Sequence, residues 1–108
     1  MFNSPTKGSL TVREVISDVA GFVQEGPGSY YRLVIGTDSQ VKSVGGKPEI
    51  DFVTAVVVHR KGHGARYFWK KEKKNKTMVL RDKIYTETLM SLSCAQELVP
   101  LLRKAVSP

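Results

Sequence analysis

Apolar positions recur with a helical period between Thr11 and Gly26. Thr11 and Glu14 have the spacing of a capping box, in which each side chain accepts a hydrogen bond from the other residue's backbone N–H. The apolar side chains that follow share one face of the expected helix: Val12, Val15, Ile16, Val19, Phe22 and Val23. The Gly-Pro-Gly run at 26–28 cannot continue a helix, so the pattern predicts an amphipathic helix that ends there.

Three apolar segments with the composition of β-strands come next. Residues 30–35 carry aromatic and β-branched side chains on both faces, which is typical of a strand covered on both sides, and we expect it to end at Gly36. A second, almost continuously apolar segment covers about residues 52–60, and a third covers residues 65–71. The few residues between them cannot form a parallel crossover, so these two segments are predicted to form an antiparallel hairpin.

The remaining segments are assigned to loops and a second helix. Residues 43–48 contain two glycines and a proline and are expected to form a loop. A lysine-rich loop at residues 70–76 precedes a helix from about Met78 to Ala105. Pro100 lacks a backbone N–H, so it is predicted to bend this helix or divide it in two.

Length and composition indicate one globular domain. The chain has 108 residues, of which 41% are hydrophobic and 25% charged. The polar residues 1–9 are expected to form a flexible tail, which leaves residues 10–108 as a single α+β domain with a mainly antiparallel sheet. No apolar run is long enough to cross a bilayer, and the single cysteine, Cys94, cannot form an internal disulfide. We therefore expect a cytoplasmic protein.

Positive charge dominates the chain and points to a polyanionic partner. Lys and Arg number 17 against 10 Asp and Glu, which gives a net charge of +7 and favours nucleic acid. The basic run Lys70, Lys71, Lys73 and Lys74 directly follows the aromatic segment 67–69. Cations beside aromatic rings can hold phosphates while bases stack, so these four lysines are the predicted nucleic-acid-binding residues. The alternative is a solvated basic loop.

Asp38 follows the first strand segment directly. Its carboxylate continues the face that carries Val34 and Gly36, and the end of a strand is a common place for binding groups. There it could bind a divalent cation or act as a base. The alternative is an Asx turn, in which the Asp38 side chain caps its own backbone.

Glu87 is the acidic residue of the last helix expected to lean toward the sheet. It falls near the edge of the apolar arc of that helix, whereas Asp82 and Glu97 fall on the solvent side. A carboxylate in that position needs a cation or hydrogen bonds, and a nearby Arg or Lys is the alternative partner. Asp38 and Glu87 together could bind one Mg²⁺ or Mn²⁺, since these ions prefer oxygen ligands.

Three segments of the sequence resemble a poorly characterised bacterial family of ribonuclease H-like proteins. They are Val34-Ile35-Gly36-Thr37-Asp38-Ser39-Gln40, Phe52-Val53-Thr54-Ala55-Val56-Val57-Val58-His59-Arg60 and Gly64-Ala65-Arg66-Tyr67-Phe68-Trp69. The resemblance implies a ribonuclease H-like fold, with a three-stranded antiparallel meander followed by a helix on the sheet. It also implies phosphodiester hydrolysis with two Mg²⁺ or Mn²⁺ ions, for which Asp38 matches the first-strand acid and Glu87 best matches the helix acid.

The resemblance also implies what this chain lacks. Ribonuclease H-like folds continue through a fourth and fifth strand, which bring at least one further metal-binding acid, and these strands are expected to be absent here. The first strand then has an open edge, so we expect a homodimer or another association to cover the edge at Tyr31–Ile35. Alternatively, the sequence is a fragment of a longer protein.

Two functional hypotheses remain open. The first is a divalent-metal-dependent nuclease, or a degenerate relative, in which Asp38 and Glu87 bind metal and act in catalysis. The second is a non-catalytic module that binds nucleic acid, DNA or RNA, or assembles with other molecules. Loss of metal-dependent cleavage in an Asp38→Asn variant distinguishes the first from the second.

Overall fold

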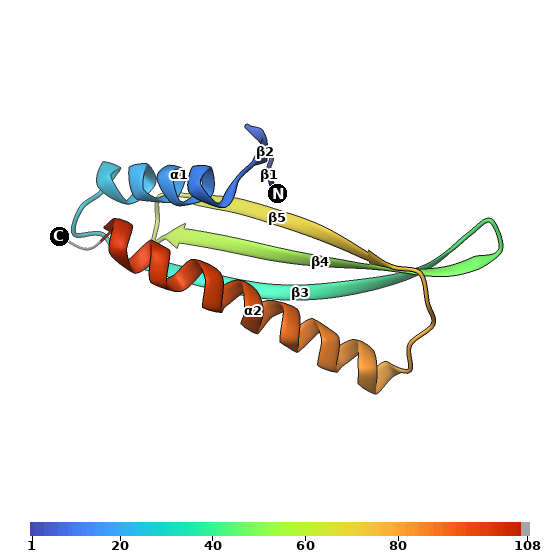
Figure 1. The fold of residues 1–108 in the computed structure, drawn as a ribbon. Helices are drawn as coiled ribbons and strands as arrows, with labels where there is room; N and C mark the ends of the chain where they lie inside the picture. Colours follow the sequence, from blue (N-terminus) through green and yellow to red (C-terminus); the bar gives the residue numbers. More distant parts are fainter. Residues whose placement is uncertain (107–108) are drawn as a thin grey trace.

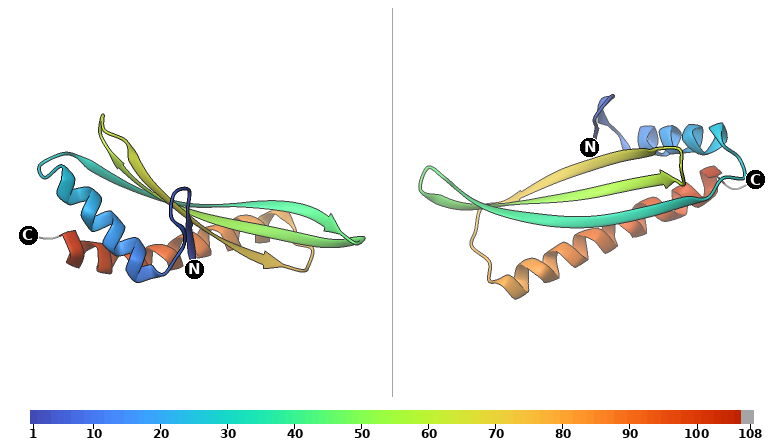
Figure 2. Two further views of the ribbon diagram at one scale, coloured as in Figure 1. Left: turned by 90° about the horizontal axis from the view of Figure 1, so that it is seen from above. Right: turned by 180° about the vertical axis from the view of Figure 1, so that it is seen from behind.

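The chain forms one five-stranded antiparallel sheet with both helices packed on the same face. The computed structural model describes residues 1–106 (Figure 1). The strands are β1 (Phe2–Ser4), β2 (Gly8–Leu10), β3 (Tyr31–Val44), β4 (Lys47–Arg60) and β5 (Ala65–Lys74), and the helices are α1 (Val12–Glu25) and α2 (Leu80–Val106). The strand order is β2-β1-β5-β4-β3, and both helices lie on one side of this sheet (Figure 2). The predicted α+β order of helix, three-stranded meander and long helix is confirmed.

Helix α1 begins with the predicted capping box. The backbone N–H of Glu14 donates to the Thr11 hydroxyl over 3.2 Å, and the backbone N–H of Thr11 donates to the Glu14 carboxylate over 2.9 Å. Val15, Val19 and Phe22 on one face are buried. The sequence therefore predicted both the bounds and the buried face of this helix.

The hairpin of β3 and β4 is longer than the apolar pattern predicts. Both strands continue to a two-residue turn at Gly45-Gly46, where φ is +58° and +78°, values that favour glycine. The expected end of the first strand at Gly36 and the expected loop at 43–48 are wrong. These polar segments are extended because they pair with each other, from Gly36↔Ala55 to Val44↔Lys47. Cross-strand pairing leaves little trace in local hydrophobicity.

The N-terminal residues form strands β1 and β2, so the flexible tail expected at residues 1–9 is wrong. Phe2 is 1% exposed and Leu10 is 6% exposed, and β1 pairs with β5 at Asn3↔Trp69. Two separated apolar side chains in a polar segment were too few to indicate a strand. With this hairpin the sheet has five strands, so the expectation that a fourth and a fifth strand are absent is wrong as a count of strands. The added strands lie beside β5, and β3 remains an edge strand, as expected.

Helix α2 is one continuous 27-residue helix that contains Pro100. Of the two outcomes expected at this proline, a bend or a division in two, the division does not occur. Pro100 and Gln96 are both exposed, so the Gln96 carbonyl, which loses its helical donor, can bond to water. The first turns of α2 stand away from the sheet and expose apolar side chains, including Leu80 and Ile84 (Figure 1). Within residues 1–106, neither helix combines the length and the hydropathy that a membrane span requires.

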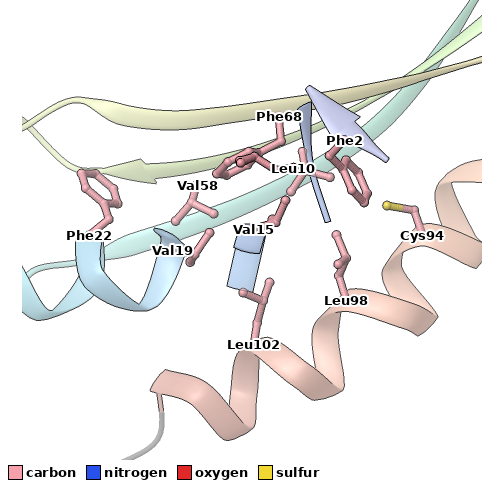
Figure 3. Packing of buried hydrophobic residues seen from close by; sticks show 11 residues of the cluster. Phe2, Leu10, Val15, Val19, Phe22, Val58, Phe68, Cys94, Leu98 and Leu102 are labelled. Atoms are coloured by element: carbon pink, nitrogen blue, oxygen red, sulfur yellow. The ribbon is translucent and has the colours of Figure 1, made fainter. Parts of the chain in front are cut away.

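The core lies between the sheet and the two helices. Val58 and Phe68 point from the sheet toward Val15 and Val19 of α1 and toward Cys94, Leu98 and Leu102 of α2 (Figure 3). Cys94 is 1% exposed, and burial raises the pKa of its thiol.

Candidate nucleic-acid interface

Asp38 of β3 points to the face of the sheet opposite to the one on which Glu87 of α2 lies. The hydroxyls of Thr37 and Ser39, on either side of Asp38, contact α2: Thr37 Oγ1 lies 2.8 Å from Ser91 Oγ, and Ser39 donates a hydrogen bond to the Glu87 carboxylate. Because successive side chains of a strand alternate in direction, Asp38 points away from α2. The expectation that both carboxylates bind one cation is therefore corrected, since β3 itself separates them.

Glu87 is held by a hydroxyl network that sequence reasoning missed. The Ser39 hydroxyl takes the place of the expected cation or basic partner, and Thr37 Oγ1 also lies 3.0 Å from the buried Thr54 Oγ1. A signal was present: Thr37 and Ser39 continue the face of β3 that carries Ile35. In the part of the chain that the structure describes, no three His, Cys, Asp or Glu side chains are grouped as metal ligands.

The four predicted nucleic-acid-binding lysines do not form one patch. They lie in β5 rather than in the expected loop, so alternate side chains reach opposite faces. Lys70 faces the helix side, where its Nζ lies 5.2 Å from the centroid of the Phe2 ring, and Lys74 lies 3.5 Å from Glu72 on that side. Lys71 and Lys73 point to the other side, as Asp38 does.

The face without helices, which we call the open face, is defined by the register of β3, β4 and β5 (Figure 2). Its rows across the sheet are Arg32–His59–Ala65, Val34–Val57–Tyr67, Gly36–Ala55–Trp69, Asp38–Val53–Lys71, Gln40–Asp51–Lys73 and Lys42–Glu49. Apolar and aromatic side chains fill the middle rows, while the outer rows are charged. A surface of this kind can bind an anionic ligand that also has apolar faces.

A hollow lies in the middle of the open face. It has a volume of about 560 Å³, and its lining includes Val34, Asp38, Val57 and Tyr67. Two small residues, Gly36 and Ala55, lie in its floor, and a Cβ built on Gly36 would meet no atom within 4 Å. Beside it the rings of Tyr67 and Trp69 lie with centroids 5.5 Å apart and planes inclined by 36°.

An ion-pair network occupies one end of the open face. Lys42 Nζ lies 2.7 Å from Asp51 Oδ2 and 3.4 Å from Glu49, and Lys71 Nζ lies 3.8 Å from Asp51. The hydrogen bond from Lys42 lowers the pKa of Asp51, and the same bond raises the pKa of Lys42. Both groups therefore stay charged at neutral pH, and Lys42 stabilises the sheet through its ion pairs with Glu49 and Asp51.

Comparison with known proteins shows the family to which the chain is similar. A family model described as ribonuclease H-like matches residues 14–107. The chain is also similar to an uncharacterized protein of Bacillus subtilis (strain 168), YkuK, with 34% identity over 100 residues. That alignment covers 92% of this chain and 56% of the relative, so the chain spans little more than half the length of the curated relative it matches. No solved structure is significantly similar.

Proposed function

Because the chain belongs to the ribonuclease H-like family, we propose that it binds nucleic acid and that the open face is the contact surface. The observation that carries this proposal is the aromatic pair Tyr67 and Trp69, which lies exposed or half-buried on the face that also carries Lys71 and Lys73. Arg32 lies at the other end of the same face. Cations at both ends of an aromatic platform suit a ligand with phosphates along its length and bases to stack.

Removing the open-face lysines is expected to weaken nucleic-acid binding by about tenfold or more. The Lys71→Ala/Lys73→Ala variant loses two phosphate-binding charges, so the slope of log affinity against log salt should also fall by about one to two. The matched control is Lys74→Ala/Lys104→Ala, which removes the same charge from the helix side and from exposed α2. Fluorescence anisotropy of a labelled oligonucleotide at several salt concentrations measures both quantities. Equal losses in the two variants would contradict a contact surface on the open face.

Metal-dependent cleavage of phosphodiesters is the second candidate function. The family favours it, and Asp38 lies exposed on the open face, in the same row as Lys71. Asp38 could bind Mg²⁺ or Mn²⁺ there, with further ligands other than Glu87, because Glu87 lies on the other face. The same oligonucleotides, incubated with Mn²⁺ and separated on a denaturing gel, test this candidate. Cleavage that Asp38→Asn abolishes and Glu87→Gln preserves supports it, whereas intact wild-type samples favour a non-catalytic binding module.

We also propose that the chain forms a homodimer through the outer edge of β3. This strand ends the sheet order, and its large apolar side chains Leu33, Val34 and Val41 are exposed. An uncovered strand of this kind can pair with the same strand of a second copy. Leu33→Lys places a charge at that edge and is expected to weaken the dimer at least tenfold, as measured by sedimentation velocity over a range of concentrations. A wild-type protein that stays monomeric at high concentration contradicts the dimer.

We propose the cytoplasm as the site of action, since Cys94 is the single cysteine of the chain and the fold uses no internal disulfide.

A further inference from the structure

We propose that the hollow of the open face is a nucleobase site for single-stranded nucleic acid, in which Asp38 reads the edge of the base. This inference rests on the proposed function and adds to it the form of the ligand and a specificity-determining residue. It joins three features of the structure: the small-residue floor, the aromatic pair and the carboxylate.

The floor of the hollow leaves room for a flat ring. Gly36 and Ala55 are neighbours across β3 and β4, and Trp69 follows in the same row. The adjacent row consists of Val34, Val57 and Tyr67, whose larger side chains extend further from the sheet than Gly36 and Ala55. Tyr67 is 41% exposed, so a base in the hollow can contact its ring. A base paired in a duplex has both faces covered by its neighbours, so stacking on this platform requires an unpaired strand.

Asp38 gives the hollow a chemical preference. Its carboxylate is exposed and lines the hollow, and the two oxygens of a carboxylate only accept hydrogen bonds. Guanine offers two adjacent N–H donors, N1–H and the N2 amine, which match the two oxygens of a carboxylate. Thymine and uracil offer one N–H between two carbonyl oxygens, and these oxygens repel a carboxylate. The geometry therefore favours guanine over thymine or uracil.

The charged residues at the two ends of the open face indicate how the single-stranded nucleic acid crosses it. Arg32 lies on one side of the hollow, and Lys71 and Lys73 lie on the other. The six residue steps from Arg32 to Asp38 span about 20 Å of β-strand, which is the length of a few nucleotides. Phosphates on both sides of the central base can thus reach a cation while the base occupies the hollow.

Trp69 allows a direct test, because it is the only tryptophan in the chain. Wild-type protein is titrated with the single strands d(TTTGTTT) and d(TTTTTTT), and with the duplex form of the first, while Trp69 emission is recorded. We expect both single strands to quench this emission, d(TTTGTTT) to bind about fivefold or more tightly than d(TTTTTTT), and the duplex to leave the emission unchanged. Asp38→Leu should abolish the preference for guanine, whereas Glu87→Gln should keep it, because Glu87 lies on the other face.

The outcomes separate this inference from the function on which it rests. Binding seen by anisotropy without a change in Trp69 emission, or equal quenching by the duplex, overturns the nucleobase site and leaves nucleic-acid binding intact. A preference for guanine that survives in Asp38→Leu overturns the role of Asp38. Absence of binding to every oligonucleotide overturns both proposals. A blue shift of Trp69 emission with protein concentration, together with no response to oligonucleotides, shows that a second copy covers the open face instead.

Discussion

Replacing Phe68 with alanine is expected to lower the free energy of unfolding by about 3–5 kcal/mol, because the change empties a fully buried aromatic site. Phe68 is 0% exposed and packs between the sheet and both helices (Figure 3). Its neighbour Tyr67 points to the open face, so Tyr67→Ala should cost less than about 1 kcal/mol. Urea denaturation followed by circular dichroism measures both values.

This pair of variants tests the division of the sheet into a core face and an open face. Phe68 and Tyr67 are adjacent in β5, so they share the same strand and similar backbone pairing. Similar losses of stability in the two variants would mean that both faces are covered, and the open face would then not be free to bind a ligand. A large loss at Phe68 alone supports the site described above.

Gly36→Leu is expected to weaken binding of single-stranded nucleic acid by about tenfold or more without lowering stability. The new side chain fills the floor of the hollow, where stacking is worth about 1–3 kcal/mol per base. It meets no atom that would have to move, since the space over Gly36 is empty. Glycine inside a strand also costs about 0.5–1 kcal/mol relative to alanine, so thermal stability should stay level or rise.

Gly21→Ala in α1 provides the control for this variant. A Cβ at Gly21 also meets nothing within 4 Å, but this residue lies on the helix side of the sheet. The change should raise stability slightly through helix propensity and leave nucleic-acid binding unchanged. Anisotropy titrations and melting curves of both variants separate loss of the hollow from a general effect of replacing glycine. Undiminished binding by Gly36→Leu counts against the hollow as a binding site.

Local patterns in the sequence predicted the elements that depend on local physics. The capping box of Thr11 and Glu14 and the period of the apolar residues after it gave α1, because both signals lie within one helical segment. The short connection before Ala65 gave the antiparallel pairing of β4 and β5. The extensions of β3 and β4 toward Gly45-Gly46 were missed, because their polar residues are extended through pairing with each other.

The site depended on a choice that the sequence leaves open. Residues 33–36 are apolar or glycine on both faces of β3, so the pattern does not say which face the helices cover. The prediction that Asp38 shares one face of β3 with Val34 and Gly36 is confirmed. The prediction that Asp38 faces Glu87 is wrong, since Thr37 and Ser39 rather than Asp38 face α2.

The sequence by itself determined the helices, the antiparallel meander and the excess of positive charge, because each follows from neighbouring residues or from composition. Only the tertiary structure decided that Asp38, Lys71 and Lys73 share one face while Glu87, Lys70 and Lys74 lie on the other. The physical reason is that alternation along a strand fixes which side chains point the same way, whereas the packing of both helices on one side decides which of the two faces remains open.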